Sequence, residues 1–396
     1  MFAKMDAYKN RYMLTGFLAE QGYDWWWHSF TGIHEETGEE RAFFIEYYLC
    51  NPALSGAKPK YGRFPKKHLR RSEPVLGQLP ENKALGKKPS YMMVKAGCWG
   101  EEHLQLHRFF AWRDVEVRTG APYGVKGGDC IVSEDRIQGH VTVTKEEAAA
   151  HPEYMCDSGE MSWDLVVDKK IAYNVGYGTS VPLCAMEAFE MYWHAQGMKT
   201  HYSGVVTLNG ERYIVIPGRS YGYADKNWGR DFTSPWVWLA SSDLRSNLSG
   251  KRLLNSAFDI GGGRPKVYAL PLPQRLLGAF YYEGEEFEFN FSKFWNPTRT
   301  KFHCQETKEE IIWKVTQENR DAIMKVRVTC CKKDMLFVNY ESPDGEKRHN
   351  RLWNGGNAKG RILLYRKIDG KKVLVDDIEA GHIGCEYGVY DGFAQL

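Results

Sequence analysis

The polar residues that could do chemistry are concentrated in one stretch near the middle of the chain. Residues 222–231 read GYADKNWGRD and combine carboxylates, an amide, aromatic rings and glycines with little hydrophobic periodicity. This composition predicts a loop between two strands, and binding groups usually sit on loops that a rigid scaffold holds in place. Asp225 is the residue of this loop that could act as an acid. An aspartate here could equally cap a turn, and the sequence leaves both roles open.

A carboxylic acid that stays protonated in an apolar cavity can donate a proton to a bound molecule. Asp225 is the first candidate for this acid, and Glu187 and Asp164 are weaker ones. Aromatic faces would stabilise passing positive charge and exclude water. Asn227 either orients an oxygen of a bound molecule or bonds the backbone of its own loop. The residues expected to bind the substrate are Trp25, Trp27, His28, Tyr221, Tyr223, Asn227, Trp228 and Trp238.

Simpler roles compete with these assignments. Trp228 also fits a packed core, and a lone histidine in a strand, such as His28, is more often a buried structural residue. His103 and His107 lie four apart in a predicted strand, which is too far to share a metal ion. No other spacing matches a metal-ligand set, and no phosphate loop or nucleophile elbow occurs. The sequence therefore predicts a site without a metal or other cofactor.

The composition is that of an ordinary globular protein with many aromatic residues. The chain has 396 residues, enough for two domains, with 43% hydrophobic and 26% charged residues and a net charge of +3. The aromatic content of 14% suits all-β proteins and aromatic-lined cavities. No secretory signal or membrane span is evident, and the nine scattered cysteines suggest reduced thiols. These features predict a cytoplasmic protein that does not bind nucleic acid, with its oligomeric state open.

Turn signals and short β-rich runs predict hairpins along most of the chain. The strongest signal is Asn209-Gly210 between residues 204–208 and 211–216, because both central residues of a type I′ turn need φ > 0. Two further hairpins are expected, one from residues 22–30 and 41–49, the other around Asp369-Gly370. Additional strands are expected at 91–96, 103–112, 114–117, 130–133, 136–144, 160–168, 236–239, 251–259, 266–270, 276–282, 285–291, 301–306, 309–317, 322–328 and 335–341.

The remaining segments fit turns and loops of an all-β protein. Residues 51–90 predict a long loop, and Gly261-Gly262-Gly263 predicts a flexible turn. Residues 185–197 fit either a helix or the start of a strand. Since strands do not alternate with helices, we expect an all-β fold of two antiparallel, β-barrel-like domains, residues 1–200 and 201–396, with a boundary near residues 197–203.

A series of motifs follows a fixed order along nearly the whole chain: Gly22-Tyr23, Met161-Ser162-Trp163-Asp164-Leu165, Trp193-His194, Leu208-Asn209-Gly210-Glu211, Lys226-Asn227-Trp228-Gly229, Trp236-Val237-Trp238, Gly261-Gly262-Gly263, the run from Gly360 to Leu364 and the run from Glu379 to Gly388. In order and spacing, these motifs resemble the tocopherol cyclase-like family, which is related to carotenoid hydratase and AttH-type proteins. The chain departs from the family at the entry strand, which reads Trp25-Trp26-Trp27-His28, and no transit peptide is expected.

The resemblance implies two lipocalin-like barrels with a ligand cavity. It also implies a cofactor-independent cyclase, isomerase or hydratase that donates a proton to a lipophilic, phenolic or prenyl-like small molecule. The alternative is a lipocalin-like binding protein that carries such a ligand without changing it. A buried Asp225 with a raised pKa at a cavity wall would favour catalysis, and a solvated Asp225 would favour binding.

Overall fold

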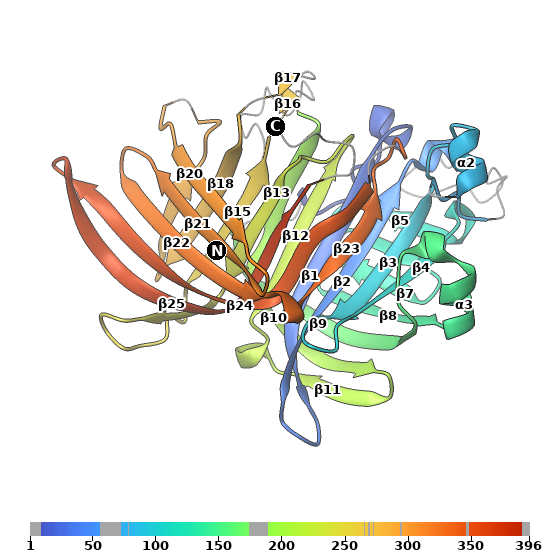
Figure 1. Cartoon of the computed structure of the whole chain (residues 1–396), viewed down its shortest axis with the longest axis horizontal. Coiled ribbons are helices and arrows are strands. Elements are labelled where there is room, and N and C mark those ends of the chain that lie inside the picture. Colours follow the sequence, from blue (N-terminus) through green and yellow to red (C-terminus); the bar gives the residue numbers. More distant parts are fainter. Residues whose placement is uncertain are drawn as a thin grey trace.

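The computed structural model describes residues 9–55, 73–77, 79–173, 189–264, 266–267, 270–271, 273–293, 295–345 and 348–389. These residues form two large antiparallel sheets from successive parts of the chain (Figure 1). The first sheet is coloured blue to green and lies on the right of that view, and the second is coloured yellow to red and lies on the left. The predicted all-β class is confirmed.

The first sheet curls into a barrel. Its strand order is β4-β3-β2-β1-β11-β10-β9-β8-β7-β6-β5, with β12 paired to both β1 and β10, and β4 returns to contact β8 and β9. Two short helices, α2 (Pro80–Ala84) and α3 (Lys145–Ala150), lie beside it. The strands are β1 (Tyr23–His34), β2 (Glu40–Cys50), β3 (Tyr91–Cys98), β4 (Leu104–Phe110), β5 (Val115–Arg118), β6 (Gly124–Gly127), β7 (Cys130–Ser133), β8 (Arg136–Val143), β9 (Gly159–Tyr173), β10 (Met191–Leu208), β11 (Glu211–Val215) and β12 (Gly222–Gly229).

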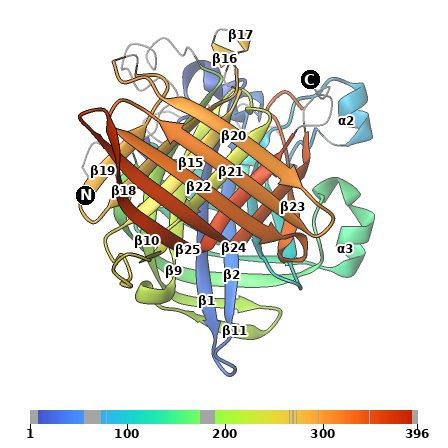
Figure 2. The ribbon, with the colours of Figure 1, turned by 60° about the vertical axis from the view of Figure 1, so that its left-hand side comes forward.

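The second sheet is an open half-barrel whose long strands run side by side (Figure 2). Its order is β19-β18-β15-β13-β25-β24-β22-β21-β20, with β14 paired to β25 and β23 to β24. A separate pair joins β16 (Lys266–Val267) and β17 (Leu270–Pro271). The strands are β13 (Trp236–Ser241), β14 (Asp243–Ser246), β15 (Ala257–Gly263), β18 (Arg275–Tyr282), β19 (Glu285–Phe289), β20 (Arg299–Glu306), β21 (Glu310–Glu318), β22 (Ala322–Cys331), β23 (Met335–Glu341), β24 (Arg348–Ile368) and β25 (Lys371–Gly388).

The predicted hairpins are present. Asn209 and Gly210 both have positive φ, of 49° and 88°, and join β10 to β11. Asp369 and Gly370, with φ of 48° and 73°, join β24 to β25 in the same way. The first predicted hairpin is the β1–β2 pair. Of the ambiguous residues 185–197, those from 191 onward belong to strand β10.

The loop predicted at residues 222–231 is wrong, because residues 222–229 form strand β12. This strand pairs with β1 on one side and β10 on the other. Side chains of a strand point alternately to opposite faces of the sheet, and both faces of β12 are buried. Polar residues occur on both of these faces, with Asp225 and Asn227 on one and Lys226 on the other. The strand therefore lacks the hydrophobic alternation that marks a half-exposed strand.

The flexible turn predicted at Gly261–Gly263 is also wrong, because these glycines end strand β15. A Cβ at Gly261 would lie 2.8 Å from the ring of Trp193, which approaches from the first sheet. A Cβ at Gly356 in β24 would lie 2.1 Å from the ring of Trp99. Glycine is needed at both positions because indoles of one sheet pack directly on the backbone of the other.

The domain division remains a prediction. The predicted boundary near residues 197–203 falls within the continuous strand β10, and the chain passes from the first sheet to the second between β12 and β13. Within the predicted loop 51–90, the described part includes helix α2, and residues 56–72 and 78 lie outside the described residues. No helix in the described part of the chain is long and apolar enough to cross a membrane.

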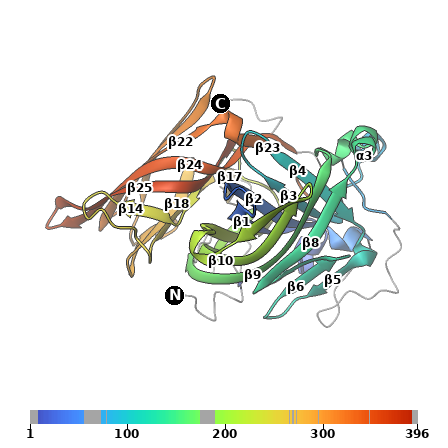
Figure 3. The ribbon, with the colours of Figure 1, turned by 90° about the horizontal axis from the view of Figure 1, so that it is seen from below.

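The buried residues form three clusters. One fills the first barrel, one belongs to the second sheet, and the third contains side chains of both sheets where they meet. Figure 3 shows the two sheets lying side by side. We call the third the inter-sheet cluster, and it includes Trp25, Trp27, Trp99, Trp193 and Trp238. It holds the polar groups described next.

Candidate active site

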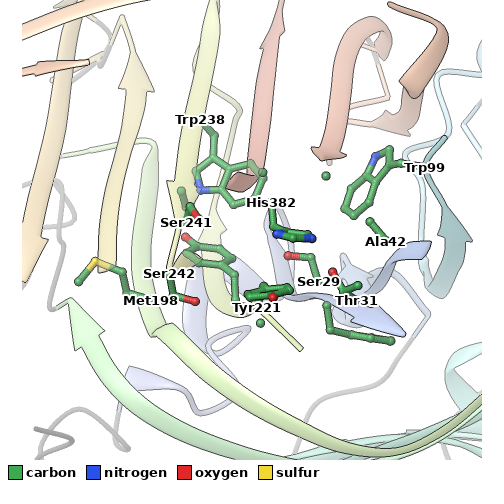
Figure 4. A pocket seen from close by; sticks show the side chains of 16 residues that line it. Ser29, Thr31, Ala42, Trp99, Met198, Tyr221, Trp238, Ser241, Ser242 and His382 are labelled. Atoms are coloured by element: carbon green, nitrogen blue, oxygen red, sulfur yellow. The ribbon is translucent and has the colours of Figure 1, made fainter. Parts of the chain in front are cut away.

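A narrow pocket lies where the two sheets meet (Figure 4). Trp99, Trp238 and Tyr223 are among the aromatic residues that line it, and Tyr221 and His382 lie together in its wall. The space open to the centre of a water molecule is about 10 Å³, which suffices for about one water. A larger ligand therefore requires wall side chains to move. Besides the tyrosines, the residues with hydroxyl groups that line the pocket are Ser29, Thr31, Ser241 and Ser242.

Tyr223 connects this pocket to two buried carboxyl groups. Its hydroxyl donates to Oδ2 of Asp259 at 2.9 Å and lies 3.4 Å from Oδ2 of Asp225. The indole N–H of Trp193 donates to the same Asp225 oxygen at 3.0 Å. Strands β12 and β15 thus bring one carboxyl each from the two sheets to a single phenol. Because the phenol has one proton, it can donate to only one of the carboxyls at a time.

Both carboxyl groups favour the protonated form. Burial raises the pKa of Asp225 well above its ordinary value, the negative charge of Glu386 raises it further, and the Trp193 and Trp25 side chains lower it. Burial likewise raises the pKa of Asp259, which the charge of Asp225 also raises and the Tyr223 hydroxyl lowers. Two neighbouring buried carboxyls rarely ionise together, so burial and the proximity of the two groups both favour keeping a proton on the pair.

Glu386 of β25 is a third acid in the same region. It accepts hydrogen bonds from the indole of Trp236 and the amide of Asn354, and Trp99 donates to Asn354 at 2.7 Å. Burial raises the pKa of Glu386 to about 7, although both donors lower it. Its charge state therefore changes near neutral pH and alters the field at Asp225.

The sequence-predicted residues divide between the faces of the first sheet. Trp25, Trp27 and Tyr223 belong to the inter-sheet cluster. Trp27 stands directly opposite Asp225, and Trp25 opposite Asn227. Asn227 accepts a hydrogen bond from Tyr23 at 2.7 Å, which is a structural contact.

His28 and Asp164 lie away from the inter-sheet cluster, and Trp228 lies at its edge. His28 faces the barrel interior and contacts the Tyr202 hydroxyl at 2.8 Å. Trp228 is half-buried, packs against the inter-sheet cluster and stacks on Tyr192, with ring centroids 5.6 Å apart. Asp164 is exposed and pairs with Arg136 at 2.6 Å.

Two more of the predicted residues, Trp238 and Tyr221, line the pocket. Trp238 packs on Tyr223, with ring centroids 4.9 Å apart. Tyr221 stacks on His382, with ring centroids 3.9 Å apart. Glu187 lies outside the described residues. The roles assigned to all of these residues stay predictions.

Sequence reasoning missed Asp259 and Glu386. Each is an acid within a run of apolar residues and glycines, AFDIGGG and IGCEYG. A carboxylate inside such a run is costly to bury unless it has a partner or carries a proton, and that signal could have identified both. Among the described residues, no group of three or more His, Cys, Asp or Glu side chains could hold a metal ion.

The pKa of Glu386 leads to a stability prediction. Because its pKa is about 7 in the folded protein and ordinarily 4.5, the native state keeps a proton that the unfolded chain has released between these values. This contribution to stability is lost as the pH rises through 7. Glu386→Gln is uncharged at every pH. As the pH rises from about 4.5 to about 7, we therefore expect the free energy of unfolding of this variant to rise relative to that of the wild type, by up to roughly 1.4 kcal/mol per pH unit, and the difference to stay constant above that range.

Urea denaturation of both proteins between about pH 5 and about pH 8 measures this difference. The comparison between variants is needed because other buried groups titrate in the same range. For example, burial lowers the pKa of His28 and His107, and this makes the native state more stable as the pH rises. A difference that does not change with pH would show that Glu386 is ionised throughout.

No protein-family model and no curated protein sequence matches the chain. One similar solved structure is a protein from Nitrosomonas europaea assigned as AttH, with 11% identity, 93% of this chain and 92% of that chain covered, and a TM-score of 0.44. Another is kievitone hydratase from Nectria haematococca, with 10% identity, coverage of 95% and 91%, and a TM-score of 0.42. Both TM-scores are below 0.5, and the function is therefore inferred below from this chain's own residues.

Proposed function

We propose that the protein is an enzyme that protonates a carbon–carbon double bond of a lipophilic small molecule bound between the two sheets. The observation that carries this proposal is the buried pair of Asp225 and Asp259, which Tyr223 connects to the pocket. Carboxyl groups kept protonated at neutral pH are the donors that such a reaction needs. The resulting activity is that of a hydratase, or of a cyclase or isomerase of the tocopherol cyclase-like kind.

Asp225 is the proposed acid. Its Oδ1 is buried and has no hydrogen bond of normal geometry from the described residues, whereas Oδ2 accepts from Trp193. A proton on Oδ1 therefore has no acceptor among the described residues, and a ligand that reaches this buried atom can take it. Tyr223 stands between Asp225 and the pocket, so its ring has to turn aside when the ligand enters, or its hydroxyl passes the proton on.

The reaction has three outcomes after proton transfer. The proton leaves Asp225 and forms a bond to one alkene carbon, and the other carbon becomes a cation. Aromatic faces such as those of Trp27 and Trp238 stabilise this charge. Water then adds to give an alcohol, an internal phenol oxygen adds to close a ring, or a neighbouring carbon loses a proton to move the double bond. Each outcome releases one proton, from the added water, from the phenol oxygen or from the neighbouring carbon, and this proton returns to the carboxylate of Asp225.

A non-catalytic binding protein is the second candidate. The observation that favours it is that Tyr223, and not Asp225, forms the pocket wall. If the tyrosine ring stays in place, a ligand is held against the aromatic wall and never reaches the acid. In that case the same pocket stores or carries a lipophilic molecule.

Isotope labelling distinguishes these activities. We expect that incubation with prenylated phenols and other unsaturated lipophilic compounds in deuterium oxide gives a product that carries deuterium on carbon. Hydratase activity also incorporates oxygen from ¹⁸O-labelled water, and ring closure does not. The reaction is expected to need no added metal or nucleotide and to survive EDTA. A compound that native mass spectrometry shows bound, but that acquires no deuterium and is not converted, would support the binding protein instead.

A further inference from the structure

The interior of the first barrel holds a buried pair that the proposed reaction does not use. Asp24 of β1 and Lys226 of β12 lie on neighbouring strands, where Asp24 is opposite Trp228 and Lys226 is opposite Trp26. The Nζ of Lys226 contacts Oδ1 of Asp24, and both side chains are 0% exposed. We propose that these side chains condense to form an intramolecular amide between Nζ of Lys226 and Cγ of Asp24.

The surroundings of the lysine favour a neutral amine. Within the described part of the chain, no polar group other than Asp24 lies within hydrogen-bond reach of its Nζ. The rings of Trp26 and Trp228 lie on it, with centroids 4.1 and 5.4 Å from Nζ. Burial lowers the pKa of Lys226 well below its ordinary value, and the charge of Arg11 lowers it further. An unprotonated amine is the nucleophile that amide formation requires.

The surroundings of the aspartate favour attack on its carboxyl carbon. The backbone N–H of Met13 donates to Oδ2 of Asp24 at 2.7 Å. Such a fixed donor stabilises the negative oxygen that develops when an amine adds to a carboxyl group. The amine and the carboxyl are held in contact without water, which replaces a bimolecular encounter with an intramolecular one.

His194 can move the protons. It is opposite Lys226 on β10, and neither of its ring nitrogens has a hydrogen-bond partner among the described residues. Burial lowers its pKa to about 3, so the imidazole is neutral and offers one N–H and one lone pair. It can accept a proton from the attacking amine and return one to the departing hydroxyl.

The reaction balances without an added reagent. A neutral amine and a neutral carboxylic acid arise from the ion pair by transfer of one proton from Nζ to the carboxylate. The Nζ–Cγ bond forms, a C–O bond of the carboxyl breaks, and one water molecule leaves. No oxidant, reductant or nucleotide takes part.

A second buried pair provides an internal control. Nζ of Lys95 lies 3.1 Å from Oε2 of Glu46, and the lysine and glutamate side chains are 0% and 3% exposed. Burial lowers the pKa of Lys95, but Glu46 raises it again. Oε1 of Glu46 accepts no hydrogen bond from the described residues, so this carboxyl lacks the second donor that Met13 provides to Asp24. This pair is expected to remain an ion pair.

Intact mass spectrometry of the denatured full-length protein tests the proposal. We expect a mass below that of the sequence by one water molecule. A tryptic digest should contain a branched peptide that joins residues 12–41 to residues 220–230, with no cleavage after Lys226. Lys226→Met should restore the full sequence mass of the variant, and Lys95→Met should keep the deficit of one water.

Asp24→Asn gives a further check, because an asparagine forms the same amide by releasing ammonia. This variant is expected to reach the same final mass as the crosslinked wild type. A wild-type mass equal to that of the sequence, with separate unbranched peptides, overturns the proposal. A deficit that persists in Lys226→Met also overturns it. The wild-type measurement does not depend on any variant folding.

Discussion

Asp225→Asn is expected to reduce turnover of the alkene substrate by ~10²–10⁴-fold, the usual contribution of general acid catalysis, while ligand affinity changes little. The amide has nearly the shape of the carboxyl group and can still accept the hydrogen bond from Trp193. It cannot deliver a proton to carbon. The loss should therefore appear in the rate of product formation at saturating substrate, and affinity should be measured separately by native mass spectrometry or titration.

Asp164→Asn is the matched control for this substitution. Asp164 was also a candidate acid, but it is exposed and paired with Arg136 on the barrel surface. Its replacement makes the same chemical change far from the inter-sheet cluster, and activity should be unchanged. If Asp225→Asn retains most of the activity, the acid is another residue, with Asp259 and Glu187 the next to be tested.

Local turn chemistry explains why much of the fold could be predicted from the sequence. Asn-Gly and Asp-Gly pairs favour hairpins because they readily adopt positive φ, and both residues do so at Asn209-Gly210 and at Asp369-Gly370. Alternation predicted the strands that have one polar face, such as β8, whose residues alternate between exposed and buried. These signals are local and need no knowledge of distant partners.

The prediction failed where two cores share one strand. Strand β12 points Tyr223, Asp225 and Asn227 toward the second sheet, and Lys226 toward the barrel. Both faces are buried and both carry polar groups, so no alternation was visible. Likewise, the glycines of β15 were read as a turn because the indole that requires Gly261 is 68 residues earlier in the chain, at Trp193.

Asp225 was proposed as the acid from the sequence, and the structure buries it, but its role stays a prediction and its partners were not foreseen. Asp225 could be singled out because it lies among aromatic residues in the central stretch. Asp259 and Glu386 come from strands that pack against it only after both sheets have formed. The pairing of acids across two sheets is a tertiary property, and a single sequence contains no spacing that reports it.

Trp193→Ala is expected to lower the free energy of unfolding by roughly 3–5 kcal/mol, as other truncations of buried aromatic side chains do. Trp193 is 0% exposed, and its indole fills the space over Gly261 in the opposite sheet. The loss should appear as a lower urea midpoint with an unchanged slope. Trp295→Ala is the control, because Trp295 is 60% exposed and surface substitutions usually change stability by less than about 0.5 kcal/mol.

Trp193→Phe separates packing from the hydrogen bond. It keeps an aromatic ring between the sheets but removes the N–H that donates to Asp225 at 3.0 Å, so we expect a smaller loss, of about 1–3 kcal/mol. Because that N–H lowers the pKa of Asp225, its removal should raise this pKa further and extend activity to higher pH. If Trp193→Ala costs no more than Trp295→Ala, the two sheets are not held together by this indole. If Trp193→Phe leaves the pH profile unchanged, Asp225 is not the group that sets it.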